Sequence, residues 1–203
     1  MTERRKLIED SEGEEYLHKD VWCVVRRQID YAEANPNGAL YDDMIAMVFA
    51  FHAIEGYLNY VGEKIAPDLW CDEKARFADS GVTGKLAALS DCCGLAPPDY
   101  GKRPYGTVRE LQKLRNAVAH PRTRKTGGTV TYDERKPPPL FPKSYLSKMV
   151  SHQRALRARD DVKAIADQLH TAARGKFPKA ALGPDALDGI MSMRSSTTRL
   201  AQR

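Results

Sequence analysis

Arg115, Asn116 and His120 are the residues whose types and spacing best suit chemistry on a phosphodiester. On an α-helix Asn116 and His120 share a face, because they are four residues apart. Arg115 lies about 100° from Asn116 around the same helix. A guanidinium fork binds a pair of phosphate oxygens, and an imidazole exchanges a proton near neutral pH. The three residues therefore predict charge stabilisation and proton transfer at a phosphate.

Cleavage of RNA by transesterification needs a base and an acid, and one histidine cannot readily be both in a single step. Two copies of His120, brought together across a dimer axis, could divide the two tasks. Pro121 disfavours helical backbone at the residue before it. We therefore expect His120 to lie in the last turn of a helix.

The motif lies within a strongly basic segment, residues 102–125, that holds eight lysines and arginines against one acid, Glu110. The basic residues are Lys102, Arg103, Arg109, Lys113, Arg115, Arg122, Arg124 and Lys125. A polyanion bound here would gain from phosphate neutralisation, and its affinity would fall as salt rises. The plainer interpretation is a solvated helix face followed by a basic loop. The nearest candidates for binding RNA beside the motif are Lys113, Arg122, Arg124 and Lys125.

Apolar residues recur at three- and four-residue steps over most of the chain, which predicts helices. The long helices are expected at residues 14–34, 40–65, 107–119 and 144–174, with Thr107 as an N-cap. Two short helices are expected at 72–78 and 83–93. Residues 122–143 break the pattern, because Gly127-Gly128 permits a short hairpin at 129–132 and three prolines follow. The predicted fold is an all-α, up-and-down helical bundle with one irregular loop or short hairpin before the last long helix.

The segment Leu111–Pro121, the upstream helix around residues 53–59 and the closing amphipathic helix together resemble HEPN domains (higher eukaryote and prokaryote nucleotide-binding). The resemblance spans residues 14–174 and includes the family's Arg-polar-x-x-x-His motif. It implies a homodimer that joins two motifs in one cleft, and a metal-independent RNA endonuclease of a defence or toxin system, with a protein antitoxin as a possible partner. It also implies His120 as the acid–base group, Arg115 as the phosphate clamp and Asn116 as an aid to positioning.

A second interpretation makes the same fold a non-catalytic dimerisation or binding protein for RNA, a nucleotide or a protein partner, since function resides in the site rather than the fold. Glu55 supports it, because an acid at the border of an apolar stripe needs a partner, and Arg115 could be that partner. Asn59 and His52 lie on the same flank of the helix. His52 with Glu55 gives only two metal ligands, so neither a metal nor a cofactor is predicted.

The 203 residues carry a net charge of +5 and four cysteines without a C-x-x-C spacing, which disfavours a zinc site or a disulfide framework. The longest apolar run, residues 44–51, is far shorter than a membrane span, and the N-terminus does not resemble a signal peptide. We therefore expect a cytoplasmic protein without a membrane segment. The expected division is an N-terminal extension (1–13), the helical domain (14–174) and a tail (175–203), docked or mobile. The lone histidines His18, His152 and His170 are expected to be exposed.

Overall fold

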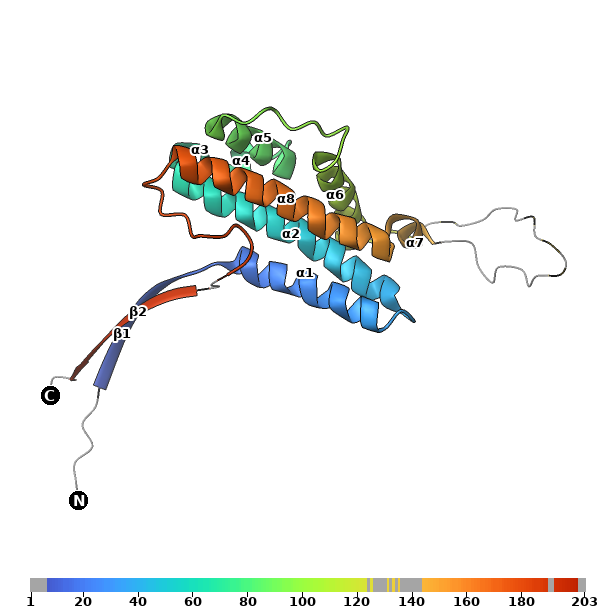
Figure 1. Ribbon diagram of the computed structural model, residues 1–203, viewed down its shortest axis with the longest axis horizontal. Helices are drawn as coiled ribbons and strands as arrows, with labels where there is room; N and C mark the ends of the chain where they lie inside the picture. Colours follow the sequence, from blue (N-terminus) through green and yellow to red (C-terminus); the bar gives the residue numbers. More distant parts are fainter. Residues whose placement is uncertain are drawn as a thin grey trace, which may run out of the picture.

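A computed structural model describes residues 7–123, 144–189 and 192–200 of the chain, with the single positions 125, 131, 133 and 135. Four helices form its body: α1 (Leu17–Ala34), α2 (Ala39–Ile65), α6 (Tyr105–Ala119) and α8 (His152–Lys176). α2 lies at the centre and contacts the other three (Figure 1). The predicted helical class is therefore confirmed for the body of the protein.

α2 is central because apolar side chains surround most of it. Phe51, Ile54, Tyr57 and Leu58 are almost fully buried among the other helices. In the described part of the chain, α2 is the one helix long and apolar enough to cross a membrane, and half of its most apolar stretch is buried inside the bundle. That burial is typical of a core helix.

Three shorter helices connect α2 to α6: α3 (Pro67–Trp70), α4 (Glu73–Arg76) and α5 (Gly81–Cys93). α5 packs on α2 and α8, and it ends at Gly94, whose φ of 72° lies in the left-handed region. Glycine adopts this conformation without strain, so it commonly ends helices. α4 and α5 correspond to the two short helices expected from the sequence.

The start of α6 differs from the prediction, because the helix begins at Tyr105 and Thr107 is not its N-cap. The Thr107 hydroxyl instead donates a hydrogen bond of 2.5 Å to Oδ2 of the buried Asp161. Arg103 donates to the same carboxylate from Nε (2.9 Å) and Nη2 (2.7 Å). The carboxylate thus joins the start of α6 to the middle of α8.

The last helix predicted from the sequence is two helices, α7 (Tyr145–Met149) and α8. Two residues, Val150 and Ser151, separate them in extended conformations. The Ser151 hydroxyl accepts a hydrogen bond from the Arg154 backbone N–H at 3.3 Å, as an N-cap does. The serine therefore starts a new helix where the apolar periodicity suggested a continuous one.

Two strands, β1 (Leu7–Glu15) and β2 (Ser192–Leu200), pair in an antiparallel ribbon. The ribbon projects from the end of the bundle beside the start of α1 (Figure 1). The segments predicted as an N-terminal extension and a tail thus pair with each other, which the sequence did not indicate. The predicted loop or hairpin within residues 122–143, including residues 129–132, falls mostly outside the described residues.

Between α8 and β2, the chain docks on the bundle through residues 177–189. Ala186 and Leu187 are buried, and the carbonyl of Gly183 accepts a hydrogen bond from Nε2 of His170 at 2.9 Å. His18 and His170 are only 5% and 4% exposed. The prediction that these two histidines are exposed is therefore wrong, because the docked tail covers a cluster to which both belong.

Candidate functional site at the end of α6

Arg115 and Asn116 lie together near the C-terminal end of α6. Nη1 of Arg115 donates a hydrogen bond of 3.0 Å to Oδ1 of Asn116. The guanidinium carbon lies 5.4 Å from the centre of the Phe51 ring on α2, a distance at which the ring face attracts a cation. Asn116 is exposed and Arg115 is half-buried. The amide and the ring therefore hold the guanidinium in place while part of it faces solvent.

His120 directly follows α6 as its C-cap residue. Its backbone φ of −125° and ψ of 67° are not helical, as expected for a residue before proline. Its backbone N–H still donates to the Asn116 carbonyl at 3.0 Å, which fixes the residue to the end of the helix. The imidazole is exposed. His120 therefore lies at the helix end, as predicted from Pro121.

A surface depression of about 230 Å³ lies beside His120, between the end of α6 and α7. Its lining comprises Ala117, His120, Pro121, Arg122, Ser144, Tyr145 and Leu146. Arg115 is not among these residues, since it faces α2 rather than α7. Five helical steps place side chains about 140° apart. Within one chain, Arg115 and His120 thus share one end of the helix but not one pocket.

Glu55 does not form the expected ion pair with Arg115 in the part of the chain that the structure describes. Its carboxylate lies 3.7 Å from Nδ1 of His52 on the same helix, while Arg115 binds Asn116. No third His, Cys, Asp or Glu of the described residues joins His52 and Glu55 to form a candidate metal site.

Asn59 belongs to a different cluster. Its Oδ1 accepts hydrogen bonds from Nζ of Lys85 at 2.9 Å and from Nε1 of Trp70 at 3.4 Å. Lys85 also pairs with Glu73. These bonds connect α2 to α4 and α5, so Asn59 serves a structural link rather than the Arg115 site.

The basic segment is only partly available to a ligand. Lys113, Arg122 and Lys125 are exposed, and these three extend the positive charge around the end of α6. Arg103 is paired with Asp161, and Arg109 lies 4.9 Å from the centre of the Tyr100 ring. Arg124 lies outside the described residues.

A second charged cluster, which the sequence reasoning missed, lies where α1, α2 and α8 meet. Nδ1 of His152 lies 2.9 Å from Oδ1 of the buried Asp43, and its Nε2 lies 3.5 Å from Oε1 of Glu33. The prediction of an isolated, exposed His152 therefore does not hold. Asp43 was the available signal, because an acid among the apolar positions of a core helix needs a partner.

No family model matches this chain, and neither a curated protein nor a solved structure matches it significantly. The structure establishes a mostly helical bundle with a two-stranded ribbon. Membership of the HEPN family remains a prediction from the motif.

Proposed function

We propose that this protein is a metal-independent RNA endonuclease of HEPN type that acts as a homodimer. The observation that carries the proposal is that Arg115 and His120 both reach solvent at one end of α6. Within the described residues, neither side chain is paired with a carboxylate. A guanidinium held by an amide and a ring, without a competing acid, remains free to bind a phosphate.

In the proposed reaction, one His120 removes the proton of a ribose 2′-hydroxyl, and the oxygen attacks the adjacent phosphorus. The second His120 gives a proton to the leaving 5′-oxygen, so the two histidines divide the roles of base and acid in one cleavage step. Arg115 stabilises the negative charge that develops on the phosphate oxygens. The products are a 2′,3′-cyclic phosphate and a 5′-hydroxyl.

In this proposal, dimerisation supplies the second proton-transfer group, which a single chain lacks. Arg115 faces α2 and His120 faces α7, so a single copy offers one proton-transfer group and a guanidinium on different sides of α6. Two copies meeting at this end would bring two His120 side chains to one RNA strand. The exposed Lys113, Arg122 and Lys125 would then contact the flanking phosphates.

The test is cleavage of mixed RNA in EDTA by the full chain, with end-group analysis of the products. His120→Ala should lower the rate by about a hundredfold or more, as for loss of a general acid–base group. Arg115→Ala should lower it by about a hundredfold, as for loss of a charge-stabilising donor. His52→Ala is the matched control, because His52 is an exposed histidine outside the motif. Cleavage that persists in both motif variants would disprove the mechanism.

The second candidate is a non-catalytic dimerisation or binding protein. The observation in its favour is the depression beside His120, whose lining includes the aliphatic side chains of Ala117, Pro121 and Leu146. Such a surface suits a protein partner as well as RNA. A folded dimer that binds RNA or a protein but cleaves no substrate would favour this candidate.

A further inference from the structure

α1 forms one edge of the bundle, where it packs on α2 and α8 (Figure 1). Uncharged residues recur along one side of this helix at alternating four- and three-residue steps. This row, called the α1 row below, comprises Leu17, Val21, Val24, Gln28 and Tyr31. The spacing is that of the seam along which two helices of a coiled coil pack.

Much of the α1 row is uncovered in the single chain. Leu17 and Tyr31 are 65% and 57% exposed. Val24 is half-buried and is not part of the core that the described helices form. Leu40 and Tyr41, in the first turn of α2, are exposed as well and closely follow the end of α1. Large apolar side chains that gather on a surface in this way mark an interaction site, whereas single ones do not.

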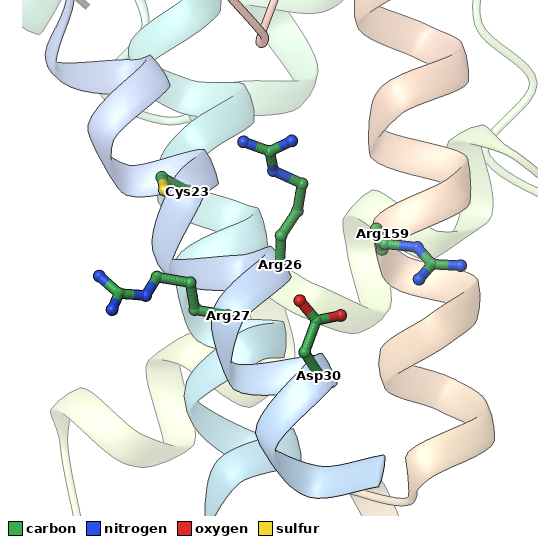
Figure 2. A pocket seen from close by; sticks show the side chains of 5 residues that line it. All are labelled: Cys23, Arg26, Arg27, Asp30 and Arg159. Carbon is green, nitrogen blue, oxygen red and sulfur yellow. The ribbon is translucent and has the colours of Figure 1, made fainter. Parts of the chain in front are cut away.

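Two charged residues of opposite sign, Asp20 and Arg27, border the α1 row. They are seven residues apart, so they lie on the same side of α1 and about 10 Å from each other along its axis. Both are exposed, and neither forms an ion pair within the residues that the structure describes. Figure 2 shows Arg27 pointing away from α8, while Arg26 extends from the side of α1 toward α8. One free acid and one free base therefore flank the row.

We propose that the α1 row is an interface with a second copy of this chain, in which two α1 helices pack antiparallel. A two-fold axis beside Val21 and Val24 brings the valines of both copies together at the centre. It also places Asp20 of each copy near Arg27 of the other, so both charge pairs form at once. A parallel arrangement would instead set Asp20 against Asp20 and Arg27 against Arg27. Flanking charges of this kind set partner choice and orientation in paired helices, and here they make the α1 row complementary to itself.

The same charges disfavour other occupants. A nucleic acid or an anionic membrane would gain from a cluster of basic side chains, but the α1 row has none, and Arg27 is balanced by Asp20. The row is also separate from Arg115 and His120, which lie at the end of α6, so it does not depend on the proposed ribonuclease activity. A chain that also dimerises at the end of α6 would use α1 to join two such dimers. The test therefore follows the change in mass when α1 is altered.

The test measures the mass of the full chain by sedimentation equilibrium over a series of concentrations. Leu17→Lys should weaken self-association by about tenfold or more, since a charge replaces an apolar side chain in the seam. Because Leu17 is exposed, the helical circular dichroism and the stability in urea should stay those of the wild type. Asp20→Arg and Arg27→Asp should each weaken association by about tenfold, because two attractive pairs become two repulsive ones.

Exchanging both charges, Asp20→Arg with Arg27→Asp in one chain, should restore the association of the wild type. An equal mixture of the two single variants should also associate more tightly than either alone, because one carries two positive and the other two negative charges at these positions. Arg76→Asp is the matched control, since Arg76 is an exposed arginine on α4, and it should leave the mass unchanged.

A wild type that stays monomeric, or that keeps its mass in Leu17→Lys, would overturn the proposal. A double exchange that associates no better than the single variants would also overturn it. Binding of the wild type to vesicles of phosphatidylcholine and phosphatidylserine, lost in Leu17→Lys, would overturn it in favour of a membrane-binding face.

Discussion

Tyr57 on α2 and His170 on α8 are 113 residues apart, and their side chains meet inside the bundle with the hydroxyl 3.2 Å from Nδ1. Nε2 of the same ring lies 2.9 Å from the Gly183 carbonyl oxygen. A carbonyl only accepts hydrogen bonds, so Nε2 carries the proton and Nδ1 accepts from Tyr57. The neutral imidazole thus connects the core to the docked tail.

Replacing Tyr57 with phenylalanine removes that hydroxyl and leaves Nδ1 of His170 without its donor. Because the site is buried, we expect the free energy of unfolding to fall by about 1–2 kcal/mol, measured by urea denaturation. Tyr41→Phe is the control, since Tyr41 is 67% exposed, and its stability should match that of the wild type. Unchanged stability in the Tyr57 variant would show that the hydrogen bond contributes nothing.

The stability of the protein should fall between about pH 6.5 and pH 4, because burial of His18 lowers its pKa to about 4. Lys19 lowers this pKa further, and Nε2 of His18 is buried without a partner in the described structure. Well above pH 6.5 the histidine is neutral in both the folded and the unfolded state. As the pH falls, the unfolded state takes up the proton first, which costs the folded state about 3 kcal/mol by pH 4.

Burial also lowers the pKa of His170, so this residue adds to the loss of stability as the pH falls. Urea denaturation at several pH values would measure both. His18→Phe retains an aromatic ring against Tyr60, where the two rings are 5.0 Å apart, but it has no proton to gain. Its stability should therefore change less with pH than that of the wild type. Parallel profiles for the two proteins over this range would contradict the assignment to His18.

The helices could be predicted because their signals are local. The apolar stripe of α2 and the stop at Asn35–Gly38 lie within neighbouring residues, so the expected helix at 40–65 agrees closely with Ala39–Ile65. Pro121 likewise fixed the place of His120 at a helix end, since a proline acts on the residue before it.

The ribbon could not be predicted, because β1 and β2 pair residues from opposite ends of the sequence, such as Leu7 with Leu200. Acids dominate β1 and serines and threonines dominate β2, so neither strand has the apolar alternation that predicts a half-buried strand. The burial of His18 and His170 was missed for a related reason. Their cover is the docked tail, and its packing on the bundle is a tertiary contact that helical periodicity does not encode.

The sequence predicted that the candidate site lies at the end of a helix. It did not predict which residues of other helices contact the site. Glu55 was a sensible partner for Arg115 from its place on the apolar stripe. The register between α2 and α6 instead brings Phe51 under the guanidinium and leaves Glu55 beside His52. Register between packed helices depends on the fit of many side chains, which a helical periodicity does not encode.

Gly62→Ala should destabilise the protein, although alanine is the better helix former. A Cβ at this position in α2 would overlap the ring of Trp70, which is 6% exposed. Displacing the ring should cost about 1–3 kcal/mol, as overpacking does. Gly175→Ala is the matched control, because a Cβ there meets nothing within 4 Å, and it should gain up to about 1 kcal/mol. Urea denaturation should give these opposite signs, and equal effects would refute the packing explanation.

Thr107→Val should separate the start of α6 from α8 without changing the shape of the side chain. The substitution removes the 2.5 Å hydrogen bond to Oδ2 of the buried Asp161, which then keeps only Nε of Arg103 as a donor among the described residues. We expect a loss of about 1.5–3 kcal/mol, as for hydrogen bonds to charged groups. Thr171→Val is the control, since its hydroxyl bonds only to the Asp167 carbonyl on an exposed helix face. Equal stability of the two variants in urea would show that this bond is not a link between the helices.

Asn116→Ala should show whether the amide positions Arg115, as the proposed ribonuclease mechanism requires. The substitution removes the 3.0 Å partner of the guanidinium but keeps the backbone bond from His120, which uses the Asn116 carbonyl. We expect kcat to fall about tenfold, because a guanidinium that can move away from its position stabilises the charge on the phosphate less well. KM and the shape of the pH profile should change little, since His120 is intact.

Asn116→Asp restores an acceptor for Arg115, and it should recover most of kcat while raising KM, because its charge repels the RNA phosphates. Glu110→Ala, an exposed change on the same helix, controls for general effects on α6. A merely structural role for Asn116 predicts lower stability in urea and equal losses in the Ala and Asp variants. The split between kcat and KM therefore distinguishes positioning of the guanidinium from support of the helix end.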